Sequence, residues 1–121
     1  MKCRDIIELL EQEFPMKYAE SWDNTGFQVG NREKEVTHIF VAMDVTDENI
    51  EEAIRVGADM IVTHHPMIFS PLSSITSDTI NGRRVIKMIE NGICYMSTHT
   101  NYDSCRMADL AAARLEMTEC V

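Results

Sequence analysis

The chain has 121 residues, of which 45% are apolar and 26% charged, and its formal net charge is −9. This length and composition predict one folded α/β domain over residues 1–121 and exclude a disordered chain. Because the only cluster of basic residues is the pair Arg83 and Arg84, we expect no direct nucleic-acid partner.

The sequence carries no pattern typical of a membrane protein or of an exported one. No apolar run approaches the roughly 20 residues that span a bilayer, and the opening "MKCRDIIELLEQEF" has acidic residues inside its apolar pattern, unlike a signal peptide. We therefore expect no membrane partner and a cytoplasmic location. The cysteines form no CxxC pair, so we interpret them as reduced thiols that mostly pack: Cys3, Cys94, Cys105 and Cys120.

The first third of the chain predicts a helix, an irregular segment and a strand. Ile6, Ile7, Leu9, Leu10 and Phe14 recur at helical spacing until Pro15 stops the pattern. The segment "SWDNTGFQVGN" reads as a loop or a short strand with turns. The run "VTHIFVAMDV", residues 36–45, is rich in β-branched residues and predicts a central strand buried on both faces.

Helices and strands then alternate to the end of the chain. Thr46 is placed to cap the next helix, Pro66 and Pro71 break any regular pattern, and Gly82 weakens the helix in which it lies. The predicted elements are a helix at 47–57, a strand at 58–63, a loop at 64–78, a helix at 79–92, a strand at 93–99 and a helix at 104–117.

Strands separated by helices predict a mainly parallel sheet with helices on both faces. In such sheets the ligand site lies beyond the carboxyl ends of the strands. Polar residues follow all three predicted strands there: Asp44, then His64 and His65, then His99 and Asp103.

Imidazoles and a carboxylate suit divalent metals such as zinc, iron and manganese. The alternative is that each histidine only caps a strand or satisfies a backbone group. Motifs of other chemistries are missing, namely GxG, GxxxxGK, HExxH and GxSxG. Cys94 or Cys105 with His99 as base would suggest a nucleophile, but packing is the better interpretation of these thiols.

Four segments, "SWDNTGFQVG", "VAMDVT", "THHPMIFSP" and "STHTNYDS", together resemble the Nif-three-like family, whose members are often called GTP cyclohydrolase type-two homologues. The resemblance implies an α/β fold, a dinuclear metal centre with His64, His65 and Asp103 as ligands, and homo-oligomers that are commonly hexamers. Family members are longer and complete the site with an HxxxE-type motif that this sequence lacks. We therefore expect the chain to match the N-terminal half of a family member and to be inactive alone.

The remaining motif residues are assigned to the surroundings of the metal. Asp44 is interpreted as a hydrogen-bond partner of a metal ligand, or else as a turn cap beside Thr46. His99 is expected to act within the site or on a small-molecule substrate without binding the metal, while Trp22 and Asn24 are expected to line the substrate cavity, although Trp22 also suits a core. The predicted function is a metal-dependent hydrolase; the alternative is a metal-binding interaction or regulatory protein without catalysis.

Overall fold

The computed structural model describes residues 1–120, which contain a single four-stranded sheet with the strand order β1-β4-β3-β2. Strands β2 (Ile39–Ala42), β3 (Met60–Thr63) and β4 (Cys94–Ser97) are parallel. Strand β1 (Gly26–Val29), which lies in the segment predicted to be a loop or short strand, pairs antiparallel with β4. The predicted α/β fold with a mainly parallel sheet is confirmed.

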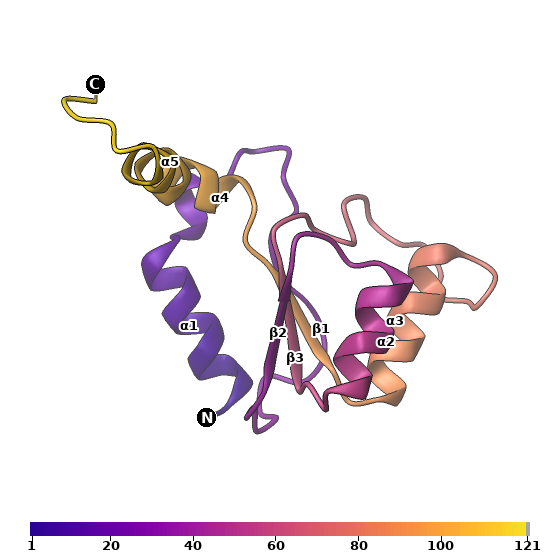
Figure 1. Ribbon diagram of the computed structural model, residues 1–121. Coiled ribbons are helices and arrows are strands. Elements are labelled where there is room, and N and C mark those ends of the chain that lie inside the picture. The colour runs from indigo at the N-terminus through magenta and orange to yellow at the C-terminus, as the bar shows by residue number, and fades with distance from the viewer. Residues whose placement is uncertain (121) are drawn as a thin grey trace.

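Helices cover both faces of this sheet (Figure 1). Helix α1 (Cys3–Glu13) lies on one face, and α2 (Asp47–Arg55) and α3 (Ile80–Glu90) lie side by side on the other. Because side chains alternate along a strand, β3 and β4 contribute to a core on each face. The core under α2 and α3 includes Ile50, Ala53, Ile61, Val85, Met88 and Tyr95. The core under α1 includes Cys3, Ile6, Ile7, Met60, Val62, Cys94 and Met96.

Local hydrogen bonds explain where α2 and α3 begin. The Thr46 hydroxyl accepts a hydrogen bond from the Asn49 amide at 3.1 Å, and the Thr79 hydroxyl accepts one from the Gly82 amide at 3.1 Å. Gly82 has a further reason to be glycine, because a Cβ there would lie 2.1 Å from the Thr76 carbonyl oxygen. The residue that weakens α3 therefore allows the preceding loop to pack against it.

The prediction of a buried central strand at 36–45 is wrong. Only Ile39–Ala42 form β2, and within the described chain β2 has β3 as its sole neighbour, so it is an edge strand. Every second side chain of β2, including that of Val41, faces the side of the sheet that carries α1. Because α1 packs over β3 and β4 and does not cover β2, Val41 is 75% exposed. The apolar run of β2 thus reflects one covered face and one open face.

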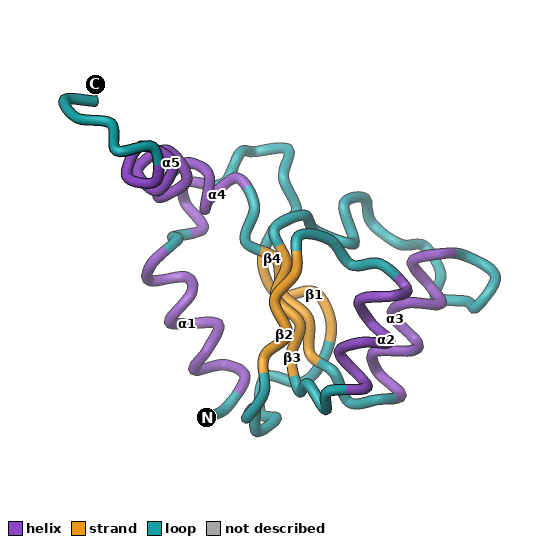
Figure 2. The backbone as a smooth tube through the Cα atoms, viewed as in Figure 1, coloured by secondary structure: helices purple, strands orange, loops and turns teal. Residues whose placement is uncertain are grey.

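The last helix begins earlier than predicted. Helical backbone runs without a break through α4 (Thr100–Tyr102), a π-helical stretch (Asp103–Met107) and α5 (Ala108–Arg114), as the purple segment of Figure 2 shows. The predicted apolar face of this helix is largely open, since Met107, Leu110 and Leu115 are exposed.

A 3₁₀ turn, Met16–Tyr18, precedes β1. In the part of the chain that the structure describes, no helix is long and apolar enough to cross a bilayer.

Asp59 ties the amino ends of β2 and β3 together. Its Oδ2 accepts hydrogen bonds from the Thr37 amide at 2.8 Å and the His38 amide at 3.2 Å, and its Oδ1 lies 3.1 Å from the Lys34 Nζ. The backbone hydrogen bond from Thr37, followed by the smaller contributions of the Thr37 hydroxyl, Lys34 and His38, holds the pKa of Asp59 well below its ordinary value despite partial burial.

We expect Asp59→Ala to lower the free energy of unfolding at pH 7 by about 1 to 3 kcal/mol, because hydrogen bonds to a charged acceptor are lost. A carboxyl with a depressed folded pKa stabilises the fold above its unfolded pKa of about 3.9, and that stabilisation is lost as the pH falls through the folded pKa. The difference from wild type should therefore shrink in urea titrations run below about pH 4. Glu8→Ala, at an exposed position on α1, is the control. A difference that is independent of pH would contradict this account.

Candidate metal centre

The register of β3 with β4 sets the position of His64. Thr63 pairs with Ser97 as the last pair of the ladder, and the Thr98 amide then donates to the Thr63 carbonyl at 2.9 Å. The His64 Nδ1 lies 2.9 Å from the Thr98 carbonyl oxygen, so its ring lies beyond the carboxyl ends of both strands. The His65 amide donates to the carbonyl of Met43 at 3.0 Å, which fixes the second histidine beyond the end of β2.

Three imidazoles meet at this edge of the sheet, and we call them the histidine trio: His64, His65 and His99. One nitrogen from each ring lies within 4.8 Å of the corresponding nitrogens of the other two. The ring centroids of His64 and His65 are 4.9 Å apart, and that of His99 lies 5.1 and 5.5 Å from them. These separations allow the three nitrogens to approach one ion after small side-chain rotations.

An oxygen atom lies opposite the Nδ1 of every ring in the histidine trio. In the tautomer whose Nδ1–H donates to this oxygen, each Nε2 keeps its lone pair and is available to an ion. This is how metal-binding histidines are oriented in proteins. The partners are the Thr98 carbonyl at 2.9 Å from His64, Asp44 Oδ1 at 2.7 Å from His65, and Asp23 Oδ1 at 3.0 Å from His99.

Asp103 lies opposite the free nitrogen of His64. Its Oδ1 is 3.4 Å from the His64 Nε2, and it is buried without a hydrogen-bond partner within residues 1–120. In a tetrahedral site with bonds of about 2.1 Å, two ligand atoms stand about 3.4 Å apart. A buried carboxylate oxygen without a donor is costly unless a cation is close. The residues present therefore fit a divalent metal ion between His64 and Asp103.

The structure extends the set of residues that could hold this ion. Sequence reasoning gave His64, His65 and Asp103 as ligands and kept His99 out of the set. The structure brings His99 into the trio, with a ring nitrogen within 4.8 Å of nitrogens of the other two rings. Asp44 lies beside His65 as a hydrogen-bond partner, which is the arrangement that the first of its two interpretations requires.

Asp23 is the residue of the candidate site that sequence reasoning missed. Its side chain is fully buried, and its Oδ2 accepts hydrogen bonds from the Thr100 hydroxyl at 2.5 Å and the Thr100 amide at 3.2 Å. Burial alone would raise the pKa of Asp23, but the hydrogen bonds from His99 and Thr100 outweigh it and hold the pKa below its ordinary value. The sequence offered one signal for it, because Asp23 is a carboxylate between Trp22 and Asn24 in the motif "SWDNTGFQVG".

Trp22 and Asn24 lie at the margin of the histidine trio. The Trp22 ring is 59% exposed and stands edge-on to His99, with 6.2 Å between the ring centroids. The Asn24 Nδ2 donates to the Ile68 carbonyl at 2.5 Å. Asn24 thus joins the loop before β1 to the loop after β3.

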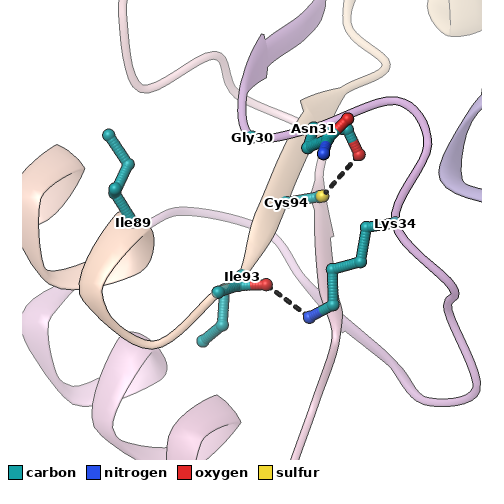
Figure 3. A pocket seen from close by; sticks show the side chains of 7 residues that line it. Gly30, Asn31, Lys34, Ile89, Ile93 and Cys94 are labelled. Carbon is teal, nitrogen blue, oxygen red and sulfur yellow. Dashed lines mark hydrogen bonds between the residues drawn. The ribbon is translucent and has the colours of Figure 1, made fainter.

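Two of the cavities in residues 1–120 lie at opposite ends of the sheet. One, of about 450 Å³, adjoins His64 and is lined mainly by apolar side chains that include Val41, Val62 and Met107. The other, of about 490 Å³, lies where β4 begins (Figure 3). At its wall the Lys34 Nζ donates to the Gly92 carbonyl, and the Cys94 thiol contacts the Asn31 carbonyl at 3.5 Å. Of these two cavities, the first borders the candidate metal centre.

Comparison with known proteins places these features in a family. The profile of the family described as Duf34/NIF3 (NGG1p interacting factor 3) matches residues 1–121. A protein of Clostridium perfringens named GTP cyclohydrolase 1 type 2 homolog is 48% identical over 104 residues, which are 86% of this chain and 40% of the relative. A Streptomyces coelicolor protein of the same name is 35% identical and matches 96% of this chain and 41% of its own length.

Two solved structures share the fold. A Bacillus cereus protein related to NIF3 superposes with a TM-score of 0.90 at 38% identity, over 98% of this chain and 33% of that chain. Reduced HcgD from Methanocaldococcus jannaschii gives a TM-score of 0.89 at 33% identity, over 98% of this chain and 48% of that one. The chain thus spans less than half the length of these relatives.

We expect Asp44→Ala to weaken zinc binding about 10-fold to 100-fold, because His65 loses the partner that orients its ring. Competition with a chromophoric chelator measures the affinity. Asp44 is exposed, so the melting temperature should change little. Asp109→Ala, an exposed aspartate on α5, is the matched control and should bind zinc as wild type does. Equal affinities for the two variants would show that the contact between Asp44 and His65 has no part in metal binding.

Proposed function

The chain belongs to the Duf34/NIF3 family, and we propose that it is the metal-binding part of a metal-dependent hydrolase that acts on a small molecule. The proposed ligands are His64, His65 and Asp103, joined by His99, and the proposed ions are zinc, iron or manganese. The observation that carries the proposal is the buried Asp103 Oδ1, which has no hydrogen-bond partner among residues 1–120 and lies 3.4 Å from the His64 Nε2. The names of the relatives support a cyclohydrolase type of reaction on a nucleotide.

A divalent ion in this position would polarise a substrate and lower the pKa of water. The side chains of this chain prepare the site for it. Asp44 and Asp23 keep His65 and His99 oriented, and the Thr98 carbonyl does the same for His64. His65 is half exposed whereas His64 is largely covered, so a substrate would approach from the side of His65.

A second ion is part of the proposal, with ligands that lie outside this chain. Two-ion hydrolytic sites hold the ions about 3.5 to 4 Å apart through bridging groups. Three histidines and one aspartate suit one well-held ion better than two. The relatives are more than twice as long, which leaves room for the remaining ligands in their other parts. Hydrolysis by these 121 residues alone would accordingly be slow or absent.

An interaction or regulatory role is the second candidate. It is favoured by exposed apolar side chains in and next to β2 and at the end of α5, namely Val41, Met43 and Leu115. The family description itself refers to an interacting factor. In this case the ion would stabilise the site and the surface would bind a partner. A bound metal fits both candidates, so turnover has to separate them.

Metal counting by mass spectrometry, combined with a GTP assay, tests the proposal. We expect one divalent ion per wild-type chain, loss of that ion in His64→Ala and Asp103→Ala, and retention in the matched control His38→Ala. His38 is a suitable control because its ring contacts Thr37 at the opposite end of the sheet. A wild-type protein that binds no zinc, iron or manganese would contradict the proposal.

Turnover is measured on the same preparations and on the Clostridium perfringens relative. Slow GTP hydrolysis by this chain and metal-dependent hydrolysis by the longer relative are expected. Rapid metal-dependent turnover by the 121-residue chain would contradict the idea of a shared two-ion site. A metal-loaded relative without activity on any nucleotide would favour the regulatory candidate.

We also propose that the chain forms homo-oligomers through the open face of β2, with a hexamer as the form that the family resemblance implies. Light scattering should show that Val41→Lys lowers the molar mass in solution, because a charge would then enter the contact. Ile75→Lys, at an exposed apolar position on the loop before α3, should leave the molar mass unchanged. A monomeric wild-type protein at high concentration would end this proposal.

A further inference from the structure

Two aromatic side chains remain exposed beside the histidine trio, and we call them the aromatic pair: Trp22 and Phe69. Trp22 is 59% exposed and Phe69 is 50% exposed. Their ring centroids are 6.1 Å apart and their planes meet at 46°. The centroid separation is within the range of interacting aromatic rings, so the two rings pack against each other without covering either one completely.

The loops that carry the aromatic pair are fastened to each other next to both rings. The loop with Trp22 precedes β1, whereas the loop with Phe69 follows β3. Three hydrogen bonds join these segments: Asn24 Nδ2 donates to the Ile68 carbonyl at 2.5 Å, Gln28 Nε2 donates to the same carbonyl at 2.9 Å, and the Ile68 amide donates to Gln28 Oε1 at 3.0 Å. A fourth, from Gln28 Nε2 to the Asn24 carbonyl at 2.6 Å, fixes the Gln28 side chain that makes two of them. The pair is thus held in place before any ligand arrives.

The aromatic pair is also directly connected to the candidate metal centre. The Trp22 ring stands at 77° to His99, with 6.2 Å between centroids. His99 is in turn 5.1 Å from His64 and 5.5 Å from His65, centroid to centroid. A flat molecule stacked on Trp22 would therefore lie close to the histidine trio.

The side chains around this place contribute negative charge and would not attract an anion by themselves. The acidic neighbours of the trio are Asp23, Asp44 and Asp103. Among residues 1–120, the hydrogen bonds and ion pairs of the trio and of these three acids involve no lysine or arginine. Nothing in these contacts resembles the cationic clamp that a triphosphate requires.

We propose that the aromatic pair is a stacking site for an uncharged, planar heteroaromatic ring, such as a nucleobase, whose edge faces the histidine trio. The inference deepens the proposed function, on which it rests for the ion at that edge. Stacking on aromatic side chains accepts any flat ring, because every base has a π-face. The site therefore binds the ring in preference to phosphates and distinguishes poorly between one purine and another.

The chain offers its own reporter, because Trp22 is its single tryptophan. The protein is titrated with guanosine, adenosine, GTP and inorganic tripolyphosphate while the tryptophan emission is recorded. Because polyphosphates chelate zinc, GTP and tripolyphosphate are compared on metal-free protein, and the two nucleosides on both the zinc-loaded and the metal-free forms. We expect both nucleosides to quench the emission with dissociation constants within about threefold of one another, GTP to quench as well, and tripolyphosphate neither to quench nor to compete on the metal-free protein. Competition by tripolyphosphate together with no response to guanosine would overturn the inference.

Variants separate stacking from folding and from metal binding. Phe69→Ala keeps the reporter and should weaken guanosine binding about 5-fold to 100-fold. Trp22→Ala, followed by equilibrium dialysis, should do the same, Trp22→Phe should restore part of the affinity, and Tyr18→Ala, at an aromatic residue that is also half exposed, should leave it unchanged. Wild-type affinity in both alanine variants would overturn the inference.

Zinc content measured on the same samples keeps the two proposals distinct. Trp22→Ala and Phe69→Ala should retain zinc, because neither residue is among the proposed ligands. Zinc-loaded protein that fails to bind nucleosides would overturn the stacking site and leave the metal site standing. Nucleoside quenching in a wild-type protein that binds no metal would support stacking and contradict the proposed hydrolase.

Discussion

The parallel register of β3 with β4 is the constraint on which the candidate centre depends. Because Thr63 and Ser97 form the last pair, β3 and β4 end at the same level of the sheet, and the His64 ring can reach the Thr98 carbonyl. A shift by one residue would turn His64 to the other face and separate it from Asp103. The buried cores on both faces hold this register, since the same shift would move the buried side chains of β3 toward the wrong helices.

Polar contacts around the histidine trio fix the orientations of its three rings. The histidines come from the ends of β3 and β4, but the groups that orient them come from three different places: the backbone after β4, the end of β2 and the loop before β1. Asp23 contributes most to these contacts, because it holds His99 and also fixes Thr100 at the start of the last helix. Through Thr100, the same carboxylate helps to position Asp103 one turn further on.

The sequence was a good guide to the elements and to the edge of the sheet on which histidines gather. The alternation of strands and helices predicted parallel strands, and residues that follow parallel strands share one edge. The strand order was harder, because an apolar run does not reveal whether its neighbour is another strand or solvent; hence the error about β2. Asp23 was missed because its partners, His99 and Thr100, are distant in the sequence, and no local pattern announces such a contact.

The distances in sequence between these partners have a consequence for how the molecule folds. Asp23 and His99 are separated by 76 positions, Asp23 and Thr100 by 77, and the hydroxyl of Thr25 reaches the Ser97 carbonyl across 72. Closing such long loops costs chain entropy before any contact is gained, whereas the caps of α2 and α3 close within three residues. The loop before β1 is therefore expected to dock late, after the helices and the parallel strands have formed. An ion held by the finished centre would then slow the unfolding of the chain while leaving its rate of folding almost unchanged.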